Sequence, residues 1–370
     1  MIVNFVLPTV NMSGGIRVAA IYARELVRLG HTVHLVSPQA PTRTMRTKLR
    51  DVLRGRSWWD RPPTGSHLDH GDFNHRVLNH PGPVTNKDLP DADVVIATWW
   101  ETAEWVASLG PQKGAKVYFI QHHEIFPYLP FERCRATYRL PLHKIVVAKW
   151  LKDVMETEYG DFDVDLVPNA VDHSQFFAPT RAKQTPPTVG FLYSRVPFKG
   201  LDITLAALKR VRQLLPDARL LSFGSDASGA DQLPVGTEFV LSPAQHAIRD
   251  IYSRCDVWVT ASSSEGFNLP AMEAMACRTP VVSTRTGWPA EAIVQGENGF
   301  LVDVNDVEGL ADSILKVLSC SEQRWSELSR CAYEAVAASS WENSAAAFEA
   351  ALRRAVQVSR GASMTRRRTF

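Results

Sequence analysis

The stretch that decides the fold is Asp256–Thr284, which reads DVWVTASSSEGFNLPAMEAMACRTPVVST. It opens with Val257–Val259, a short apolar run that predicts a buried strand, and a polar loop follows. A helix comes next, with Asn268 near its N-cap and Pro270 in its first turn, where the missing N–H of proline costs nothing. Pro280–Ser283 predicts a second buried strand, so the whole stretch indicates a βαβ unit of a parallel sheet.

Two carboxylates lie where such a sheet binds its ligands. Parallel sheets bind ligands at the carboxyl ends of their strands. Glu265 is in the loop at this end, and Glu273 is one turn into the helix. The helix N-terminus offers free N–H groups and a partial positive charge, which suits a phosphate group.

The sequence around these two acids, EGFNLPAMEAMA, resembles the signature of retaining glycosyltransferase family 4 (group 1). The acid pair alone is a weak signal, and the alternative is a surface glutamate beside a helix-cap glutamate. The surrounding residues make the match specific: Gly266-Phe267, Leu269-Pro270, Ala274-Met275-Ala276 and Thr279–Val282. The resemblance implies an α/β chain with two Rossmann-like parallel-sheet domains that face a central cleft, the GT-B fold.

Composition describes a globular protein of two domains. The chain has 370 residues, of which 45% are hydrophobic and 22% are charged. Its five cysteines are scattered and have no CxxC spacing, which disfavours structural zinc and a disulfide framework and fits a reducing compartment. No apolar run reaches about 18 residues, and residues 1–8 are too short for the core of a signal peptide. We therefore expect a cytoplasmic protein that can contact the inner face of the cell membrane.

A segment near the middle of the chain marks the domain boundary. Val167–Asp172, VPNAVD, resembles the interdomain segment of the family, with Ala170 in place of the usual glycine, and a proline-rich run follows it. The expected divisions are an acceptor-binding domain at 1–168, a hinge or linker at 169–187, a nucleotide-sugar-binding domain at 188–340, a helix at 341–357 that crosses back to the first domain, and a disordered basic tail at 358–370.

The first domain opens with a strand at Ile2–Leu7, the pair Gly14 and Gly15, and a helix at Ile16–Leu29. The glycine pair lets backbone approach a ligand closely in front of a helix end. A lone pair of this kind is more often only a tight connection, and the GxGxxG fingerprint of dinucleotide binding is absent. The resemblance implies that Gly14 and Gly15 face the donor diphosphate.

Two later strands of this domain end in aromatic and polar residues. The strand at 93–98 precedes Trp99, Trp100 and Glu101, and the strand at 116–121 precedes His122 and His123. Both ends meet at one edge if the sheet is parallel. The resemblance implies a catalytic role for His122 near the reacting sugar, with His123 as its alternate, although the family's usual residues after this histidine are missing. Trp99, Trp100, Glu101 and His123 are candidates for acceptor binding, and burial in the core is the alternative.

The second domain offers cations at the end of its first strand, 189–193. Arg195 and Lys199-Gly200 stand before a helix, where they could clamp a diphosphate. The family has an arginine directly after the glycine of this strand, whereas Phe191 follows Gly190 here, so Arg195 as a solvated loop cation remains the alternative. The resemblance implies that the donor is bound by Gly14, Gly15, Arg195, Lys199, Gly266, Phe267, Asn268, Leu269 and Glu273.

Residues 41–61 are strongly basic, with Asp51 and Asp60 as their acids, and apolar residues recur near helical spacing before Trp58-Trp59. This pattern fits a basic amphipathic helix in an anionic membrane interface, and a solvated charged run is the alternative. Nucleic acid is not expected as a partner, because no aromatic stacking module accompanies the charge.

No metal site is expected. The histidines at 67, 70, 75 and 80 lie among glycines and prolines that indicate a long loop. Asp161, Asp163 and Asp165 form a DxD pattern, which holds a metal in another glycosyltransferase fold, but here they are expected in a solvated turn.

The sequence thus predicts a retaining, metal-independent glycosyltransferase without a cofactor. Its donor would be a nucleoside-diphosphate sugar, and its acceptor a glycan, a lipid-linked molecule or a small molecule. Glu265 would hold hydroxyls of the transferred sugar, and Glu273 those of the ribose. Tyr118–Leu151 weakly resembles bacterial surface-polysaccharide enzymes. The alternatives are a nucleotide-sugar epimerase or phosphorylase on the same fold and a non-catalytic sugar-binding protein.

Overall fold

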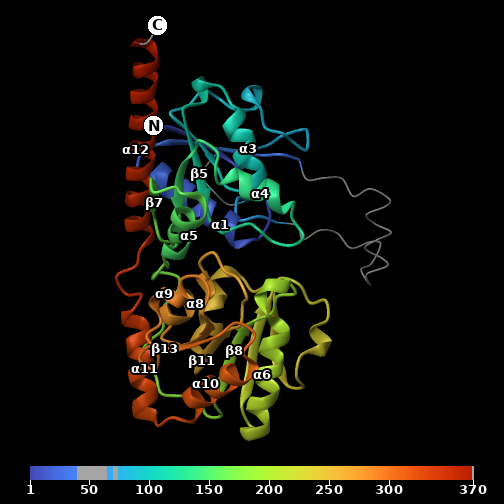
Figure 1. Cartoon of the computed structure of the whole chain (residues 1–370). Coiled ribbons are helices and arrows are strands. Elements are labelled where there is room, and N and C mark those ends of the chain that lie inside the picture. Colours follow the sequence, from blue (N-terminus) through green and yellow to red (C-terminus); the bar gives the residue numbers. More distant parts are fainter. Residues whose placement is uncertain (40–64, 70–73, 369–370) are drawn as a thin grey trace, which may run out of the picture. The chain divides into compact units, whose positions relative to one another are not determined.

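The computed structural model describes residues 1–39, 65–69 and 74–368 and divides the chain into two compact units (Figure 1). The first unit comprises Met1–Val147, Leu151–Val167 and Glu342–Phe370, and the second comprises Ala148–Trp150 and Pro168–Trp341. Each unit contains one parallel sheet with helices, as the sequence predicts.

The first sheet has seven parallel strands in the order β3-β2-β1-β4-β5-β6-β7. Its strands are β1 (Ile2–Val6), β2 (Thr32–Ser37), β3 (Asn74–Val77), β4 (Val94–Ala97), β5 (Ala115–Ile120), β6 (His143–Val146) and β7 (Val164–Leu166). Its helices before the second unit are α1 (Gly14–Arg28), α3 (Trp100–Ser108), α4 (Phe131–Thr137) and α5 (Lys149–Tyr159). The chain runs outward from β1 to β3 and returns to β4 on the other side of β1. A topological switch point therefore lies between β1 and β4, where sheets of this kind bind ligands.

Strand β3 corrects one expectation. It lies inside the glycine- and proline-rich segment that predicts a long loop, yet it pairs in parallel with β2, with His75 opposite Leu35. Its sequence, NHRV, is mostly exposed and has no run of apolar residues. An edge strand of this kind takes its conformation from the neighbouring strand, so local sequence carries little signal for it.

The last helix, α12 (Trp341–Arg368), completes the core of the first unit, which contains its residues from Glu342 onward (Figure 1). The ring of Phe348 is fully buried, and its centroid lies 4.4 Å from that of Tyr22 and 5.0 Å from that of Phe119. Beside this cluster, Glu349 accepts a hydrogen bond of 3.0 Å from His31. The helix continues to Arg368, through most of the segment for which a disordered tail is expected, because no proline interrupts it and Gly361 costs only about 1 kcal/mol within a helix.

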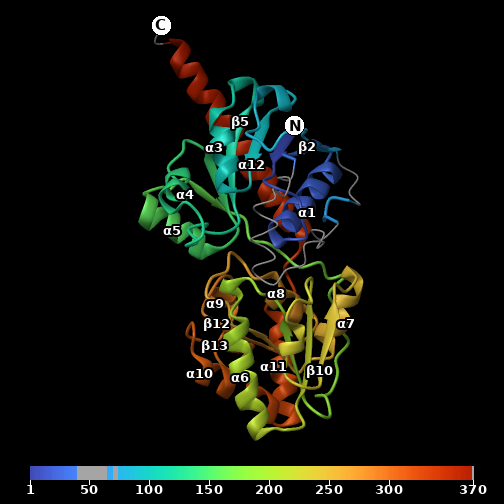
Figure 2. The same ribbon diagram turned by 90° about the vertical axis from the view of Figure 1, so that its right-hand side faces the viewer.

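The second sheet has six parallel strands in the order β10-β9-β8-β11-β12-β13. Its strands are β8 (Thr188–Leu192), β9 (Arg219–Gly224), β10 (Thr237–Leu241), β11 (Val257–Thr260), β12 (Val281–Thr284) and β13 (Gly299–Val302). Its helices are α6 (Leu201–Leu214), α7 (Ile248–Ser253), α8 (Leu269–Ala276), α9 (Pro289–Ala292), α10 (Val307–Ser319) and α11 (Glu322–Glu334). Helices α6 and α10 lie beside each other (Figure 2) and bury Leu208, Val211 and Ile314 in one core.

The switch point of the second sheet lies between β8 and β11, since the chain leaves β8 for β9 and β10 before it returns. The predicted βαβ unit is present as β11, α8 and β12, and Val259 of β11 pairs with Val282 of β12. The loops after β8 and β11 consequently start from adjacent strand ends.

The proline-rich run expected as linker is fixed to the second unit. Arg181 forms an ion pair of 3.2 Å with Asp256, whose side chain is fully buried. The same carboxylate accepts hydrogen bonds of 2.8 Å from the backbone N–H groups of Gln184 and Thr188. Burial raises the pKa of Asp256, and these hydrogen bonds together with Arg181 act in the opposite direction.

Replacing Phe348 by alanine tests the role of α12. We expect Phe348→Ala to lower the free energy of unfolding by about 3–5 kcal/mol, because it empties a fully buried aromatic position. The matched control is Val358→Ala on the same helix, where the side chain is 55% exposed and the change should stay within about 0.5 kcal/mol. Urea unfolding of the full chain measures both values, and equal stabilities would contradict the core role of α12.

Candidate functional site

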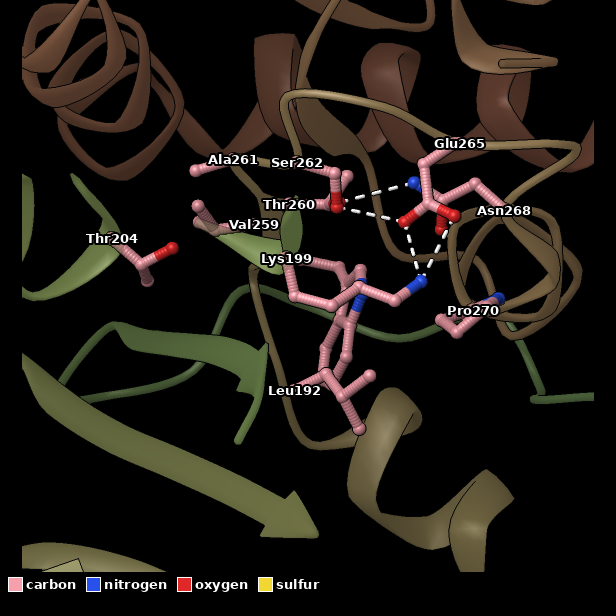
Figure 3. Close-up of a pocket in the computed structure, with 11 residues that line it drawn as sticks. Leu192, Lys199, Thr204, Val259, Thr260, Ala261, Ser262, Glu265, Asn268 and Pro270 are labelled. Atoms are coloured by element: carbon pink, nitrogen blue, oxygen red, sulfur yellow. Dashed lines mark hydrogen bonds and ion pairs between the residues drawn. The ribbon is translucent and has the colours of Figure 1, made fainter. Parts of the chain in front are cut away.

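The centre of the candidate site in the second unit is an ion pair between Lys199 and Glu265 (Figure 3). Lys199 ends a short turn after β8, and Glu265 lies in the loop after β11. The Lys199 Nζ donates to both carboxylate oxygens of Glu265, at 2.7 Å to Oε1 and 2.9 Å to Oε2. The Glu265 side chain is 7% exposed and that of Lys199 is 25% exposed, so both charges depend on each other for the interactions that water would otherwise supply.

Gly200 lets the two loops approach each other. Its φ is +64°, and an added Cβ would lie 2.1 Å from the carbonyl oxygen of Ala261. Beside it, the N–H of Ser263 donates a hydrogen bond of 2.8 Å to the carbonyl of Phe198. Lys199 reaches Glu265 because the residue after it is a glycine, which explains why a lysine-glycine pair is useful at this position.

Hydroxyl and amide side chains surround the carboxylate of Glu265. Ser262 Oγ donates a hydrogen bond of 2.7 Å to Oε1 of Glu265, and Asn268 Nδ2 donates one of 3.0 Å to Oγ1 of Thr260. Sequence reasoning missed Thr260 and Ser262. The available signal was a run of hydroxyl residues just before Glu265 in a loop between two buried elements.

A second glycine holds the signature loop against the loop after β12. Gly287 has φ +60°, and a Cβ on it would lie 2.7 Å from the carbonyl oxygen of Phe267. The N–H of Trp288 donates to that same oxygen at 2.8 Å, and its ring stacks on the ring of Phe267 with centroids 5.7 Å apart. The carbonyl of Gly266 accepts a hydrogen bond of 2.9 Å from the indole of Trp150, which also belongs to the second unit. No sequence pattern singles out Gly287 and the two tryptophans, because their roles depend on contacts between distant loops.

A small cavity lies beside the ion pair of Lys199 and Glu265. Its volume is about 20 Å³, which is room for one or two water molecules. Its lining includes Lys199, Thr260, Ser262, Glu265 and Asn268. The N-terminus of α8 lies at the same place, where Asn268 adopts φ +84° before Leu269 begins the helix. One cation, one carboxylate and the backbone N–H groups at the N-terminus of α8 thus lie close together. This combination suits an anionic, hydroxyl-bearing ligand.

Two predicted donor-binding residues lie outside this group of contacts. Glu273 is 3% exposed, and its Oε2 accepts a hydrogen bond of 2.9 Å from the hydroxyl of Tyr252. Tyr252 packs edge-to-face on Trp258, with centroids 4.7 Å apart. Arg195 is exposed in the loop after β8 and does not line the cavity.

In the first unit, the structure brings the glycine pair and the end of β5 together. Gly14 and Gly15 form the first turn of α1, directly after the loop that follows β1. The side chain of Gln121, at the end of β5, donates a hydrogen bond of 3.2 Å to the carbonyl of Gly15. An added Cβ on Gly14 would meet no atom of the described residues within 4 Å, so none of their side chains or backbone groups fills the space next to this glycine.

Of the three candidate residues after β4, one is buried in the core and two are half-buried. Trp100 is 5% exposed, and the guanidinium of Arg133 lies 5.0 Å from its ring centroid. The backbone N–H of Trp100 donates a hydrogen bond of 2.8 Å to the buried carboxyl of Glu124. Burial raises the pKa of this carboxyl. Trp99 and Glu101 are half-buried, and burial also raises the pKa of Glu101. Trp100 therefore serves packing, whereas Trp99 and Glu101 keep part of their surface available.

The two histidines after β5 differ in their surroundings. His123 packs on Tyr138 and hydrogen-bonds to the hydroxyl of Tyr159 at 2.7 Å. Burial, together with His122 and Arg135, lowers the pKa of His123 to about 4, so its ring is neutral at neutral pH. The Nδ1 of His122 lies 3.0 Å from the carbonyl oxygen of His123 and donates to it, which makes Nε2 the acceptor nitrogen of the neutral His122 ring.

The residues considered for metal binding have protein partners. His67 contacts the carbonyl of Met12, and His75 contacts the hydroxyl of Ser37. Residues 161–163 lie outside helix and strand, and the side chain of Asp163 is 62% exposed, as expected of a solvated turn, whereas Asp165 lies in β7. All three carboxylates have a cationic partner, since Lys144 pairs with Asp161 and Arg354 pairs with Asp163 and Asp165. Within the described residues, no group of three or more His, Cys, Asp or Glu side chains could hold a metal ion. His70 and the basic segment 41–61 lie outside the described residues.

Two family models match the chain. The model described as Glycosyltransferase Family 4 matches residues 12–175, and the model described as Glycosyl transferases group 1 matches residues 172–334. In the part of the chain that the structure describes, no helix is long and apolar enough to cross a membrane.

Curated relatives are D-inositol 3-phosphate glycosyltransferases. The protein from Segniliparus rotundus is 33% identical over 215 residues, which are 51% of this chain and 47% of the relative. The protein from Mycolicibacterium smegmatis is 33% identical over 181 residues, which are 45% of this chain and 40% of the relative. The chain thus matches about half the length of these relatives or less.

Solved structures share the fold. HepE from Anabaena, in complex with UDP and glucose, has a TM-score of 0.71 at 17% identity and covers 96% of this chain and 100% of its own. Sucrose-phosphate synthase from Thermosynechococcus elongatus has a TM-score of 0.72 at 17% identity, with 95% and 98% coverage. At this identity the likeness shows the fold alone.

Replacing Gly200 by alanine tests the close approach of the two loops. We expect Gly200→Ala to lower the free energy of unfolding by about 2–5 kcal/mol, from left-handed strain plus the collision with Ala261. The control is Gly296→Ala in the same unit, which has φ +77° and meets its nearest atom at 3.8 Å, so it should lose only about 1–2 kcal/mol. Equal losses in urea unfolding of the full chain would show that the contact with Ala261 does not constrain the loop.

The environment of His123 predicts a pH dependence of stability. The unfolded histidine binds a proton near pH 6.5, whereas the folded one stays neutral down to about pH 4. The His123 contribution is therefore fully present above about pH 6.5 and is lost as the pH falls towards 4. His123→Gln should flatten the dependence in this window in urea unfolding, and the comparison at pH 8 isolates the loss that does not depend on protonation. An unchanged slope would contradict the prediction.

Proposed function

The chain belongs to the family 4, group 1 glycosyltransferases, and from this premise we propose that it is a retaining, metal-independent enzyme. It moves a sugar from a nucleoside-diphosphate sugar to a glycan, a lipid-linked molecule or a small-molecule acceptor. The observation that carries the proposal is the pair of Lys199 and Glu265 at the switch point of the second sheet. Parallel sheets bind ligands at such a switch point.

The donor needs a cation and a hydrogen-bond acceptor close together. Lys199 pairs with the diphosphate, and Glu265 accepts hydrogen bonds from hydroxyls of the transferred sugar. Backbone N–H groups from Phe267 to Leu269, at the N-terminus of α8, add partial positive charge beside the diphosphate. In this proposal the ion pair of the described structure opens, and each partner exchanges the other for a part of the donor.

The chemistry follows from the charges that develop. When the bond between the anomeric carbon and the diphosphate breaks, negative charge collects on the leaving group. Lys199 stabilises that charge without a metal ion, and the departing phosphate oxygen takes the proton of the acceptor hydroxyl. The acceptor oxygen forms the new bond on the same face, which retains the anomeric configuration, and no protein nucleophile is required.

The proposal that Glu273 binds the ribose hydroxyls rests on the family resemblance alone. Tyr252 holds one of its oxygens in the structure, so Tyr252 becomes a residue that orients this carboxylate. In the first unit, His122 is proposed to act near the reacting sugar, and Gly14 and Gly15 to face the diphosphate. Trp99, Glu101 and His123 are proposed as acceptor-side residues, and Trp100 shapes that side through packing.

The relatives and neighbours support the choice of substrates. HepE is described with UDP and glucose, which favours a nucleoside-diphosphate sugar as donor. The curated relatives are named for inositol phosphate, which favours a polar, hydroxyl-bearing acceptor. We further propose a place in bacterial surface-polysaccharide synthesis in the cytoplasm, with the basic segment 41–61 as the contact to an anionic membrane.

Lys199→Met and Glu265→Gln test the proposal. Each should lower the transfer rate by about 10²–10³-fold, because each removes a group that meets the donor where charge develops. The control is Lys209→Met on the exposed face of α6, which should retain the wild-type rate. The assay incubates the full chain with UDP-, GDP- and dTDP-sugars and inositol phosphate or bacterial lipid extract. Mass spectrometry identifies the product.

Two further measurements in the same assay separate the alternatives. NMR of the product should show the anomeric configuration of the donor, and EDTA should leave the rate unchanged. Release of nucleoside diphosphate only in the presence of acceptor indicates transfer, whereas an epimerised donor or a sugar phosphate would indicate an epimerase or a phosphorylase. Wild-type turnover in folded Lys199→Met protein would overturn the assignment of this site.

A further inference from the structure

We infer that Asn268, Thr260 and Ser262 form a one-way chain of hydrogen bonds that positions the carboxylate of Glu265 for the transferred sugar. The inference rests on the proposed function and adds three side chains to it. In the proposed function, Asn268 belongs to the donor site only because it lies at the helix N-terminus, and Thr260 and Ser262 have no role. All three are positioning residues, because they act through Glu265.

The geometry joins the four residues end to end (Figure 3). Asn268 Nδ2 lies 3.0 Å from Thr260 Oγ1, and Thr260 Oγ1 lies 3.4 Å from Ser262 Oγ. Ser262 Oγ lies 2.7 Å from Glu265 Oε1. The weakest link is therefore the one between the two hydroxyls.

The chemistry of the end groups fixes the direction of every proton. An ionised carboxylate only accepts hydrogen bonds, so Ser262 must donate its single hydroxyl proton to Glu265. The Ser262 oxygen can then only accept, which directs the proton of Thr260 towards Ser262. The Thr260 oxygen in turn accepts from Asn268, whose amide NH₂ group can only donate. With the NH₂ group of Asn268 turned towards Thr260, as in the structure, the amide donor at one end and the carboxylate at the other give all three hydrogen bonds the same direction.

The chain is buried at both Ser262 and Asn268, while Thr260 between them is half-buried and lines the small cavity. Ser262 is 1% exposed and Asn268 is 6% exposed. The carbonyl of Ser262 accepts a hydrogen bond of 2.6 Å from the hydroxyl of Thr284, which fixes the backbone of the loop. In such surroundings hydrogen bonds polarise one another, and a group left without its partner costs about 1–3 kcal/mol.

The chain matters most when the donor is bound. Lys199 then serves the diphosphate, so Glu265 loses the contact that holds both of its oxygens in the described structure. Ser262 remains as a donor to Oε1 and keeps the carboxylate in place and turned towards the sugar hydroxyls. Loss of the chain should therefore harm the handling of the sugar and spare the binding of the nucleoside diphosphate.

Single-residue variants test the chain. Thr260→Val removes one proton donor at nearly constant volume, Asn268→Gly removes the amide while permitting the left-handed backbone, and Ser262→Ala removes the last link. We expect each to lower kcat by about 5- to 100-fold, the range that corresponds to one unsatisfied buried group, with the Kd for UDP within about twofold of wild type. Thr260→Ser keeps the hydroxyl and should restore kcat to within about threefold. The control Ser263→Ala alters an exposed neighbouring hydroxyl and should change neither value.

Two comparisons separate positioning from folding. Asn268→Gly and Thr260→Val break the same chain at different links without adding charge, so they should lower kcat to a similar extent. The double variant Thr260→Val/Ser262→Ala should be no slower than Ser262→Ala alone, because one chain can be broken only once. Near-ultraviolet circular dichroism checks that each variant is folded.

The outcomes distinguish the inference from the proposed function. Unchanged kcat in Thr260→Val and Asn268→Gly, beside an active wild type, overturns the chain alone. An equal loss of UDP affinity and kcat in these variants also overturns it, since that result indicates a damaged loop. A wild-type protein that binds no nucleoside diphosphate and transfers no sugar overturns both.

Discussion

The second unit depends on a balance of charge at one point, the contact between Lys199 and Glu265. A carboxylate that is 7% exposed lacks most of its water, and only a cation with added hydrogen bonds makes this tolerable. The two loops that carry the pair come from adjacent strands, so the fold brings the charges together before any ligand arrives. The residues that would meet a donor are therefore already ordered and partly desolvated, which lowers the entropy lost on binding.

Glycine makes this arrangement possible at two places. Gly200 brings the backbone of the Lys199 turn against Ala261, and Gly287 brings the loop after β12 against Phe267. In both cases the neighbouring atom is a backbone carbonyl oxygen, which cannot rotate away as a side chain would. The signature loop is thus held from two sides by main chain, while its side chains remain available for hydrogen bonds.

The sequence predicted the parts of the fold that local pattern encodes. The βαβ unit at Asp256–Thr284 was predicted from two short apolar runs and from Asn268 and Pro270 at the start of the helix between them, and the two parallel sheets were expected from the family resemblance of this stretch. Strand β3 was missed because an exposed edge strand takes its shape from its neighbour. The chain from Asn268 to Glu265 and the partner of Glu273, Tyr252, were missed because both depend on side-chain directions that spacing does not reveal.

The discontinuity of the first unit has a consequence for synthesis of the chain on the ribosome. The strands of its sheet emerge first, but Phe348, which fills the space beside Tyr22 and Phe119, emerges only after the whole of Pro168–Trp341. The second unit is continuous over that stretch and can fold as it appears, since domains generally fold as units during translation. Until Phe348 emerges, the apolar side chains that it covers in the folded first unit lack this partner, so exposed apolar surface and aggregation are the hazard of this order of assembly.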